Sequence, residues 1–92
     1  MEDVCVRICI EGRVQDVFFR KFTKLKAVEL GIKGIVRNLP NGDVEVFAVA
    51  TRNQLEQFTT WCHEGSPLSS VKKVTVQDIP KSEEYTGFEI RH

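Results

Sequence analysis

Residues 12–20, with the letters GRVQDVFFR, combine a backbone pattern and a side chain that suit an anion site. They join an alternating apolar segment to a helical pattern, so they are expected to form a strand-to-helix turn. Backbone N–H groups in such a turn, and in the first turn of the helix, point toward a common position and bind anions. The sequence therefore places a candidate phosphate cradle immediately before the first helix.

Arg20 falls in the first turn of that helix, where a cation opposes the helix dipole at a cost of about 0.3–1 kcal/mol. A bound phosphate reverses this cost, because a guanidinium can hold a phosphate with two parallel N–H bonds. The alternative is a solvated surface arginine, and position alone does not separate the two.

Asn38 is the second polar residue of interest, because it ends a predicted strand just before a turn. An asparagine there commonly stabilises the turn. Its amide can also orient a water molecule by accepting one hydrogen bond and donating another. Both interpretations stay open at this point.

The histidines and cysteines do not assemble a familiar nucleophilic or metal site. There is no Ser-His-Asp or Cys-His-Asn set, and we expect His63 and His92 to be surface groups. Cys5 and Cys9 lie four apart on a predicted strand, roughly 13 Å at about 3.3 Å per residue, which is too far for a disulfide. With Cys62 they do not give zinc-ligand spacing, so reduced structural thiols are expected.

The elements that hold these residues are predicted from periodicity, and alternating β-branched residues predict strands. The predicted strands are residues 4–11, 33–38, 43–50 and 71–79, with a short last strand at Phe88 and Ile90. Gly12 is expected to end the first strand. Residues 39–42 predict a hairpin turn, because Asn-Gly tolerates positive φ.

Two helices are predicted from three- and four-residue spacing of apolar side chains. The first has a stripe expected to face the core, and Gly31 is expected to end it; the stripe is Phe18, Phe22, Leu25, Val28 and Ile32. The second starts with a Thr51–Gln54 capping box and continues through Leu55, Phe58 and Cys62 until residues 65–67.

The order β-α-β-β-α-β predicts an α+β, ferredoxin-like split β-α-β sandwich. We expect one domain over residues 1–92, with an antiparallel sheet of four to five strands and both helices on one face. RNA-recognition modules share this order and stack bases on aromatic residues of the third strand. Here that strand carries Phe47 beside Asp43 and Glu45, which disfavours RNA binding.

The composition argues against two classes of binding partner, nucleic acids and membranes. Thirteen basic residues balance thirteen acidic ones in 92 residues, so no global field favours nucleic acid or an anionic membrane. The acidic start does not resemble a signal peptide, and no apolar run approaches the 18–20 residues, approximately, that span a bilayer. We therefore expect a cytoplasmic protein without nucleic-acid or membrane partners, in which any anion site is built locally.

Residues 12–20 resemble the acylphosphatase signature Gly-x-Val-Gln-Gly-Val-x-Phe-Arg. The matching residues are Gly12, Val14, Gln15, Val17, Phe19 and Arg20. A second block, residues 31–46, is similar to the family pattern Gly-x-x-Gly-x-Val-x-Asn…Gly-x-Val-Glu. It is matched by Gly31, Gly34, Val36, Asn38, Gly42, Val44 and Glu45, and the closing Gly-Phe-Glu-Ile also resembles the family. The resemblance spans nearly the whole chain.

The resemblance implies a hydrolase of small-molecule acyl phosphates that uses no metal, organic cofactor or protein nucleophile. We also expect a monomer. Arg20 would hold the phosphoryl group and stabilise its charge in the transition state, while Asn38 would position the attacking water. The main-chain N–H groups of one loop would cradle the phosphoryl oxygens; its residues are Arg13, Val14, Gln15, Asp16, Val17, Phe18 and Phe19.

Asp16 departs from the family pattern, which has glycine at this position. Aspartate tolerates left-handed backbone angles better than most residues, so the turn can survive. Its carboxylate would repel phosphate by on the order of 3 kcal/mol at ~6 Å, before screening or outward rotation. The benign interpretation is that Asp16 faces solvent or caps the helix. The alternative function is a degenerate phosphate-binding module with little or no turnover.

Overall fold

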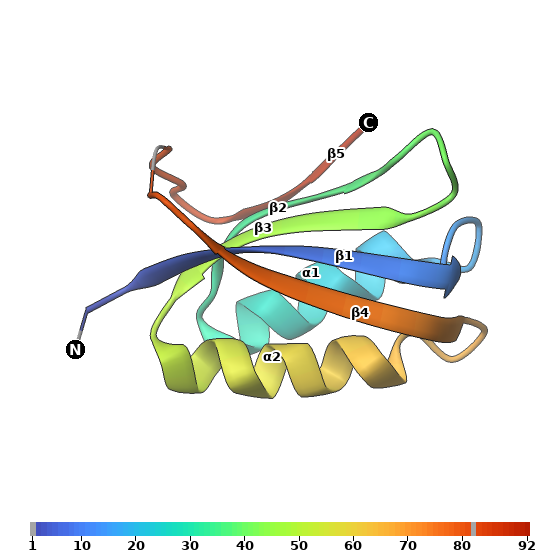
Figure 1. The fold of residues 1–92 in the computed structure, drawn as a ribbon, viewed down its shortest axis with the longest axis horizontal. Helices are drawn as coiled ribbons and strands as arrows, with labels where there is room; N and C mark the ends of the chain where they lie inside the picture. Colours follow the sequence, from blue (N-terminus) through green and yellow to red (C-terminus); the bar gives the residue numbers. More distant parts are fainter. Residues whose placement is uncertain (1, 82) are drawn as a thin grey trace.

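The alternating segments form five strands, joined by two helices in the predicted order. A computed structural model describes residues 2–81 and 83–92, and Figure 1 shows the arrangement. The elements are β1 (Val4–Arg13), α1 (Phe19–Leu30), β2 (Lys33–Asn38), β3 (Val44–Ala50), α2 (Arg52–Glu64), β4 (Ser70–Ile79) and β5 (Phe88–Arg91). Neither helix of the described chain is long and apolar enough to cross a membrane.

The strands form one sheet in the order β4-β1-β3-β2-β5, and α1 and α2 cover the same face of it (Figure 1). The four long strands pair antiparallel, as predicted. The short β5 adds to the β2 edge in parallel, with Gly34 opposite Phe88 and Val36 opposite Ile90, so the sheet is mixed. The ferredoxin-like α+β prediction is confirmed, and β5 brings the chain end beside the end of β2.

The core lies between this sheet face and the two helices. Strand β1 contributes Val6, Ile8 and Ile10, which are fully buried, and β3 contributes Val44 and Val46 opposite them. These are the inward residues of the predicted period-two alternation. Alternation decides the buried face here because every second side chain of a strand points to the same side of the sheet.

Gly12 was expected to end the first strand, but β1 continues past it. The strand continues to Arg13, and its register with β4 shifts between Glu11 and Gly12, which marks a β-bulge. Gly12 has φ of 131°, and a Cβ there would lie 2.2 Å from the Ser70 carbonyl oxygen. Glycine is required at this point so that β1 can bend while remaining paired.

The predicted buried stripe of α1 is wrong at three of its five positions, whereas Ile32 is buried as predicted and Phe22 is half-buried. Phe18, Leu25 and Val28 are 68%, 55% and 60% exposed, whereas Phe19, Thr23 and Ala27 are the buried residues of the helix. Thr23 and Ala27 are small, so the helix axis can approach the sheet closely along this face. The buried Thr23 hydroxyl donates to the Phe19 carbonyl at 2.8 Å, which satisfies its hydrogen-bonding need.

The other local predictions are confirmed. Gly31 ends α1 in a left-handed conformation at φ of 73°. Thr51 and Gln54 form the capping box of α2, whose buried residues are Leu55, Phe58 and Cys62. The 39–42 turn closes the β2–β3 hairpin, with the Leu39 N–H donating to the Asp43 carbonyl.

The sheet face away from the helices carries a buried carboxylate between two arginines. Glu45 is 4% exposed and accepts from Arg7 Nε at 2.6 Å and from Arg37 Nε at 2.7 Å. Burial by itself raises the pKa of this carboxyl, but the hydrogen bonds and charges of Arg37 and Arg7 outweigh burial and lower the pKa below 4.5. Glu45 is therefore held as a carboxylate that ties three adjacent strands together.

Replacing Glu45 with glutamine is expected to lower the free energy of unfolding at pH 7 by about 1–3 kcal/mol, the usual worth of hydrogen bonds to charged groups. A carboxyl with a depressed pKa in the folded state stabilises the fold above its unfolded pKa and loses that effect as pH falls through the folded value. Wild type should therefore lose stability below about pH 4.5, and Glu45→Gln should lose less.

Urea unfolding over a pH series measures this difference. Glu89→Gln, which removes an exposed carboxyl from β5, is the matched control and should resemble wild type. Equal acid sensitivity of wild type and Glu45→Gln would show that the buried carboxylate does not control acid unfolding.

Candidate active site

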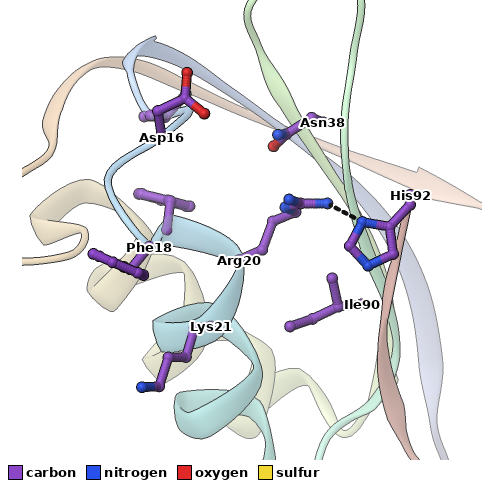
Figure 2. A pocket seen from close by; sticks show the side chains of 9 residues that line it. Asp16, Phe18, Arg20, Lys21, Asn38, Ile90 and His92 are labelled. Atoms are coloured by element: carbon purple, nitrogen blue, oxygen red, sulfur yellow. Dashed lines mark hydrogen bonds between the residues drawn. The ribbon is translucent and has the colours of Figure 1, made fainter.

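A cleft of about 480 Å³ opens where the loop before α1 faces the ends of β2 and β5 (Figure 2). Its lining residues come from these three elements and from the first turn of α1: Val14, Asp16, Phe18, Phe19, Arg20, Lys21, Asn38, Ile90 and His92. The two predicted polar residues, Arg20 and Asn38, therefore lie in one cleft although 17 residues separate them in the chain. Lys21 also lines the cleft, but its ammonium group points away from Arg20 and Asn38 (Figure 2).

The loop of the cleft has an unusual backbone. Asp16 and Phe18 both adopt left-handed conformations, with φ of 61° and 58°. Such angles are unfavourable for a bulky residue such as Phe18 and are typically kept where function requires them. Among the described residues, no group accepts a hydrogen bond from the N–H groups of residues 14–18. These N–H groups are therefore available to an anion.

Four side chains hold the strained loop in place. Val14 and Val17 are buried at 1% and 4% exposure, so their side chains anchor the loop in the core. The Gln15 amide donates to the Leu39 and Asp43 carbonyls at 2.8 and 2.9 Å, which ties the loop to the β2–β3 hairpin. On the other side, the buried Ser66 hydroxyl donates to the Val17 carbonyl at 3.0 Å. The Gln15 side chain therefore anchors the loop to the hairpin and is not free to bind phosphate.

Arg20 extends from the first turn of α1 toward the end of β5 (Figure 2). Its Nη1 donates to the Arg91 carbonyl at 3.2 Å and lies 3.2 Å from Nδ1 of His92. The N-cap residue, Phe18, offers no side-chain hydrogen bond to the helix start, and no acidic residue lies in the first turn. The positive end of the helix dipole thus faces the cleft without a compensating anion.

Asn38 ends β2 and presents an unsatisfied acceptor. Its Oδ1 is buried and has no hydrogen-bond partner among the described residues. A buried polar atom without a partner costs about 1–3 kcal/mol, so such atoms call for a bound water or ligand. Asn38 lines the same cleft as Arg20. Asn38 thus brings an unpartnered acceptor, and Arg20 a cation, to one cleft.

Part of the predicted loop lines the cleft: Val14, Asp16, Phe18 and Phe19 do, whereas Arg13, Gln15 and Val17 do not. Arg13 belongs to β1 and is paired opposite Ser70.

Sequence reasoning missed Ile90 and His92 as lining residues, because β5 reaches the site only through its pairing with β2. It also missed Lys21, which follows Arg20 in the first turn of α1. His92 was expected to be a surface group; it is exposed, yet it contacts Arg20.

The cysteines are free, as expected, and burial raises the pKa of the Cys62 thiol to about 12. Burial also raises the pKa values of Cys5 and Cys9. A thiol with a raised pKa is a poor nucleophile, since the thiolate is the reactive form. Within residues 2–81 and 83–92, no three His, Cys, Asp or Glu side chains are grouped to hold a metal ion.

A family model described as acylphosphatase matches residues 6–90 of the chain. The chain belongs to the acylphosphatase family. An acylphosphatase from Rubrobacter xylanophilus is 44% identical over 86 residues, which cover 94% of this chain and 78% of that protein. A solved acylphosphatase from Coxiella burnetii has a TM-score of 0.92 at 38% identity, covering 98% of this chain and 94% of that one. One from Bacillus subtilis also has a TM-score of 0.92, at 34% identity, with 97% and 99% covered.

Asp16 of this acylphosphatase occupies a left-handed position, which explains why glycine suits the family pattern there. Its side chain is exposed, in line with the benign interpretation. The other part of that interpretation is wrong, because Asp16 does not cap α1: the N-cap is Phe18, and the cap makes no side-chain hydrogen bond. Solvent exposure lets salt screen the repulsion between this carboxylate and a phosphate.

Replacing Asp16 with glycine is expected to keep kcat/KM for benzoyl phosphate or to raise it by up to about tenfold. The change removes a screened negative charge and an unfavourable backbone angle together. Asp16→Asn separates these effects, because asparagine loses the charge but keeps the side-chain shape. Steady-state kinetics with thermal unfolding as a folding check measures both variants. A large loss of turnover in folded Asp16→Gly would show that the carboxylate assists the reaction.

Proposed function

We propose that this acylphosphatase removes phosphate from acyl phosphates in the cleft at the start of α1. The phosphoryl oxygens bind to the N–H groups of residues 14–19 and to the guanidinium of Arg20. Lys21 contributes a further positive charge to the rim. This arrangement suits a doubly charged group, although the chain as a whole has no net charge.

Arg20 and the loop act mainly on the transition state. As the bond between phosphorus and the acyl oxygen breaks, negative charge spreads over the phosphoryl oxygens. Donors fixed before the reaction stabilise that charge without having to reorganise. The loop is held in this conformation by the buried side chains of Val14 and Val17. Hydrogen bonds from Gln15 and Ser66 hold it as well.

Asn38 holds the attacking water. Its Oδ1 accepts a hydrogen bond from the water, which directs a lone pair of the water oxygen at phosphorus. The water oxygen bonds to phosphorus while the electron pair of the broken bond leaves on the carboxylate, and the water proton passes to the phosphate product. Carboxylate is a good leaving group, so positioning and charge stabilisation suffice without a protein nucleophile.

One observation carries this proposal: Asn38, whose buried Oδ1 has no partner among the described residues, lines the same cleft as Arg20 and the loop with unpaired N–H groups. A site that only bound phosphate would need donors, not a buried acceptor. Family membership and this acceptor support the enzyme over the degenerate binding module. The RNA-binding alternative gains no support, because the outward face of β3 places Glu45 between two arginines.

Arg20→Ala and Asn38→Ala are each expected to lower kcat/KM by at least about a hundredfold, as the loss of one fixed transition-state contact does. Both should leave the unfolding temperature within a few degrees of wild type, because neither side chain belongs to the core. Hydrolysis of benzoyl phosphate, corrected for spontaneous breakdown, measures the effect.

Lys24→Ala, an exposed change on the same helix, and Asn53→Ala, an exposed asparagine on α2, are the matched controls. Both should retain wild-type rates. Wild-type rates in Arg20→Ala or Asn38→Ala would remove that residue from the site.

Inorganic phosphate is expected to inhibit competitively, because the product occupies the same cradle as the substrate. The inhibition should weaken in Arg20→Ala and stay unchanged in Lys24→Ala. Phosphate binding by calorimetry together with initial rates distinguishes the enzyme from the binding module. Tight phosphate binding with no hydrolysis above background would favour the module.

The monomeric state and the cytoplasmic location stay predictions. Analytical ultracentrifugation at several protein concentrations tests the first, and fractionation of the source cells tests the second.

A further inference from the structure

Four residues that were predicted to lie in the buried stripe of α1 form a largely exposed apolar patch. Phe18, Leu25 and Val28 are 68%, 55% and 60% exposed, and Phe22 among them is half-buried. Side chains three and four residues apart lie on one face of a helix, so these four share the face that points away from the sheet. We call them the α1 patch. A cluster of exposed apolar side chains commonly marks an interaction surface, whereas a single one does not.

Two lysines border the α1 patch along one side. Lys21 and Lys24 are exposed, and neither belongs to an ion pair among the described residues. On the other side of the patch, Glu29 accepts a hydrogen bond from Lys26 at 2.6 Å, so that side is neutral. The patch therefore has a positive border that no carboxylate compensates.

The α1 patch begins at the cleft. Figure 2 shows Phe18 and Lys21 at the edge of the cleft, both pointing away from Arg20. Val28 lies about 15 Å further along the helix, at a rise of about 1.5 Å per residue. A surface that contacts the patch therefore lies beside the mouth of the cleft.

The zero net charge of the chain conceals this local excess of positive charge. We expected no membrane partner because thirteen basic residues balance thirteen acidic ones. Helix α1, however, carries four basic residues and one acidic residue. The neighbouring α2 has the opposite balance, with exposed Glu56 and Glu64 against Arg52. Because charges act over only about 8–10 Å in physiological salt, a binding surface meets the local charges and not their sum over the chain.

Charge and shape favour one of three occupants for the α1 patch. A second copy of the chain would set one positively bordered face against another, which is repulsive. A groove in a partner protein would have to enclose the helix from both sides, but α2 runs along one side of α1 (Figure 1). A bilayer with anionic lipids needs no matching groove, because apolar side chains enter the headgroup region while lysines meet the lipid phosphates.

We propose that the outer face of α1 binds the surface of anionic lipid bilayers, with the α1 patch in the headgroup region and Lys21 and Lys24 at the lipid phosphates. Binding is peripheral and reversible, because only a few side chains enter the lipid. The bound protein lies with the mouth of the cleft next to the bilayer. Binding of this kind does not require turnover.

Sedimentation with vesicles measures the binding. The vesicles contain phosphatidylcholine alone or with about one-third phosphatidylglycerol, which is anionic. At about 0.05 M salt, wild type should partition at least about tenfold more strongly onto the anionic vesicles, and about 0.5 M salt should remove most of this preference. Asn38→Ala should bind as wild type does, so loss of the proposed reaction and loss of membrane binding are separate results.

The apolar part of the interaction is tested by Leu25→Gln with Val28→Gln. Both side chains are more than half exposed, so thermal unfolding should stay close to that of wild type. Partition onto the anionic vesicles should fall at least about tenfold, because two apolar side chains no longer enter the headgroup region. The matched control is Leu68→Gln, which removes an apolar side chain that is 69% exposed in the connection after α2. This control should bind as wild type does.

The electrostatic part is tested by Lys21→Gln with Lys24→Gln. Partition onto the anionic vesicles should fall about tenfold or more, and the weak partition onto phosphatidylcholine should not change. Lys72→Gln with Lys73→Gln removes two exposed lysines of β4 and is the matched control for total charge. It should bind nearly as wild type does, because β4 lies far from the α1 patch at the opposite edge of the sheet from β5.

Three results would refute membrane binding through α1. The first is equal partition of wild type onto anionic and neutral vesicles. The second is the same loss in the β4 lysine variant as in the α1 lysine variant, since the attraction would then depend on total charge. The third is the absence of vesicle binding together with a dimer in analytical ultracentrifugation that Leu25→Gln with Val28→Gln abolishes, which would assign the α1 patch to a second copy.

Discussion

The close packing of α1 on the sheet determines where Arg20 points, and the rest of the site depends on it. Thr23 and Ala27 are fully buried, so the axis of the helix lies near the sheet and its rotation about that axis is fixed. Phe19 completes the buried face, and the next residue, Arg20, is turned by about 100° toward β5. A different buried face on α1 would carry the guanidinium away from the cleft.

The same packing makes the preceding loop strained. The chain must enter a helix whose rotation is already set, and it does so through left-handed residues at Asp16 and Phe18. Such angles persist only where the surroundings hold them. Gln15 holds the loop from the hairpin, and Ser66 holds it from the connection after α2. The strain leaves the backbone N–H groups without partners, which is the property that an anion site needs.

Electrostatics in this protein is local on both faces of the sheet. The chain has no net charge, so no long-range electrostatic field of one sign acts at either face of the sheet. On the helix side, Arg20 lies at the positive end of a helix dipole without a carboxylate in the first turn. On the other side, Arg7 and Arg37 are neutralised in part by the buried Glu45. The sheet therefore lies between one cation that is available for a ligand and two cations that stabilise the fold.

The sequence by itself determined the strands, the order of the elements and the two polar residues of the cleft, Arg20 and Asn38. Alternation and capping are local, because they depend on backbone periods and on neighbours within four residues. Only the tertiary structure decided which face of α1 is buried. Apolar spacing favoured the face with Phe18, but close approach to the sheet selected the small side chains of Thr23 and Ala27. The contact between His92 and Arg20 also came from tertiary structure alone, because the parallel pairing of β5 with β2 joins residues far apart in the chain.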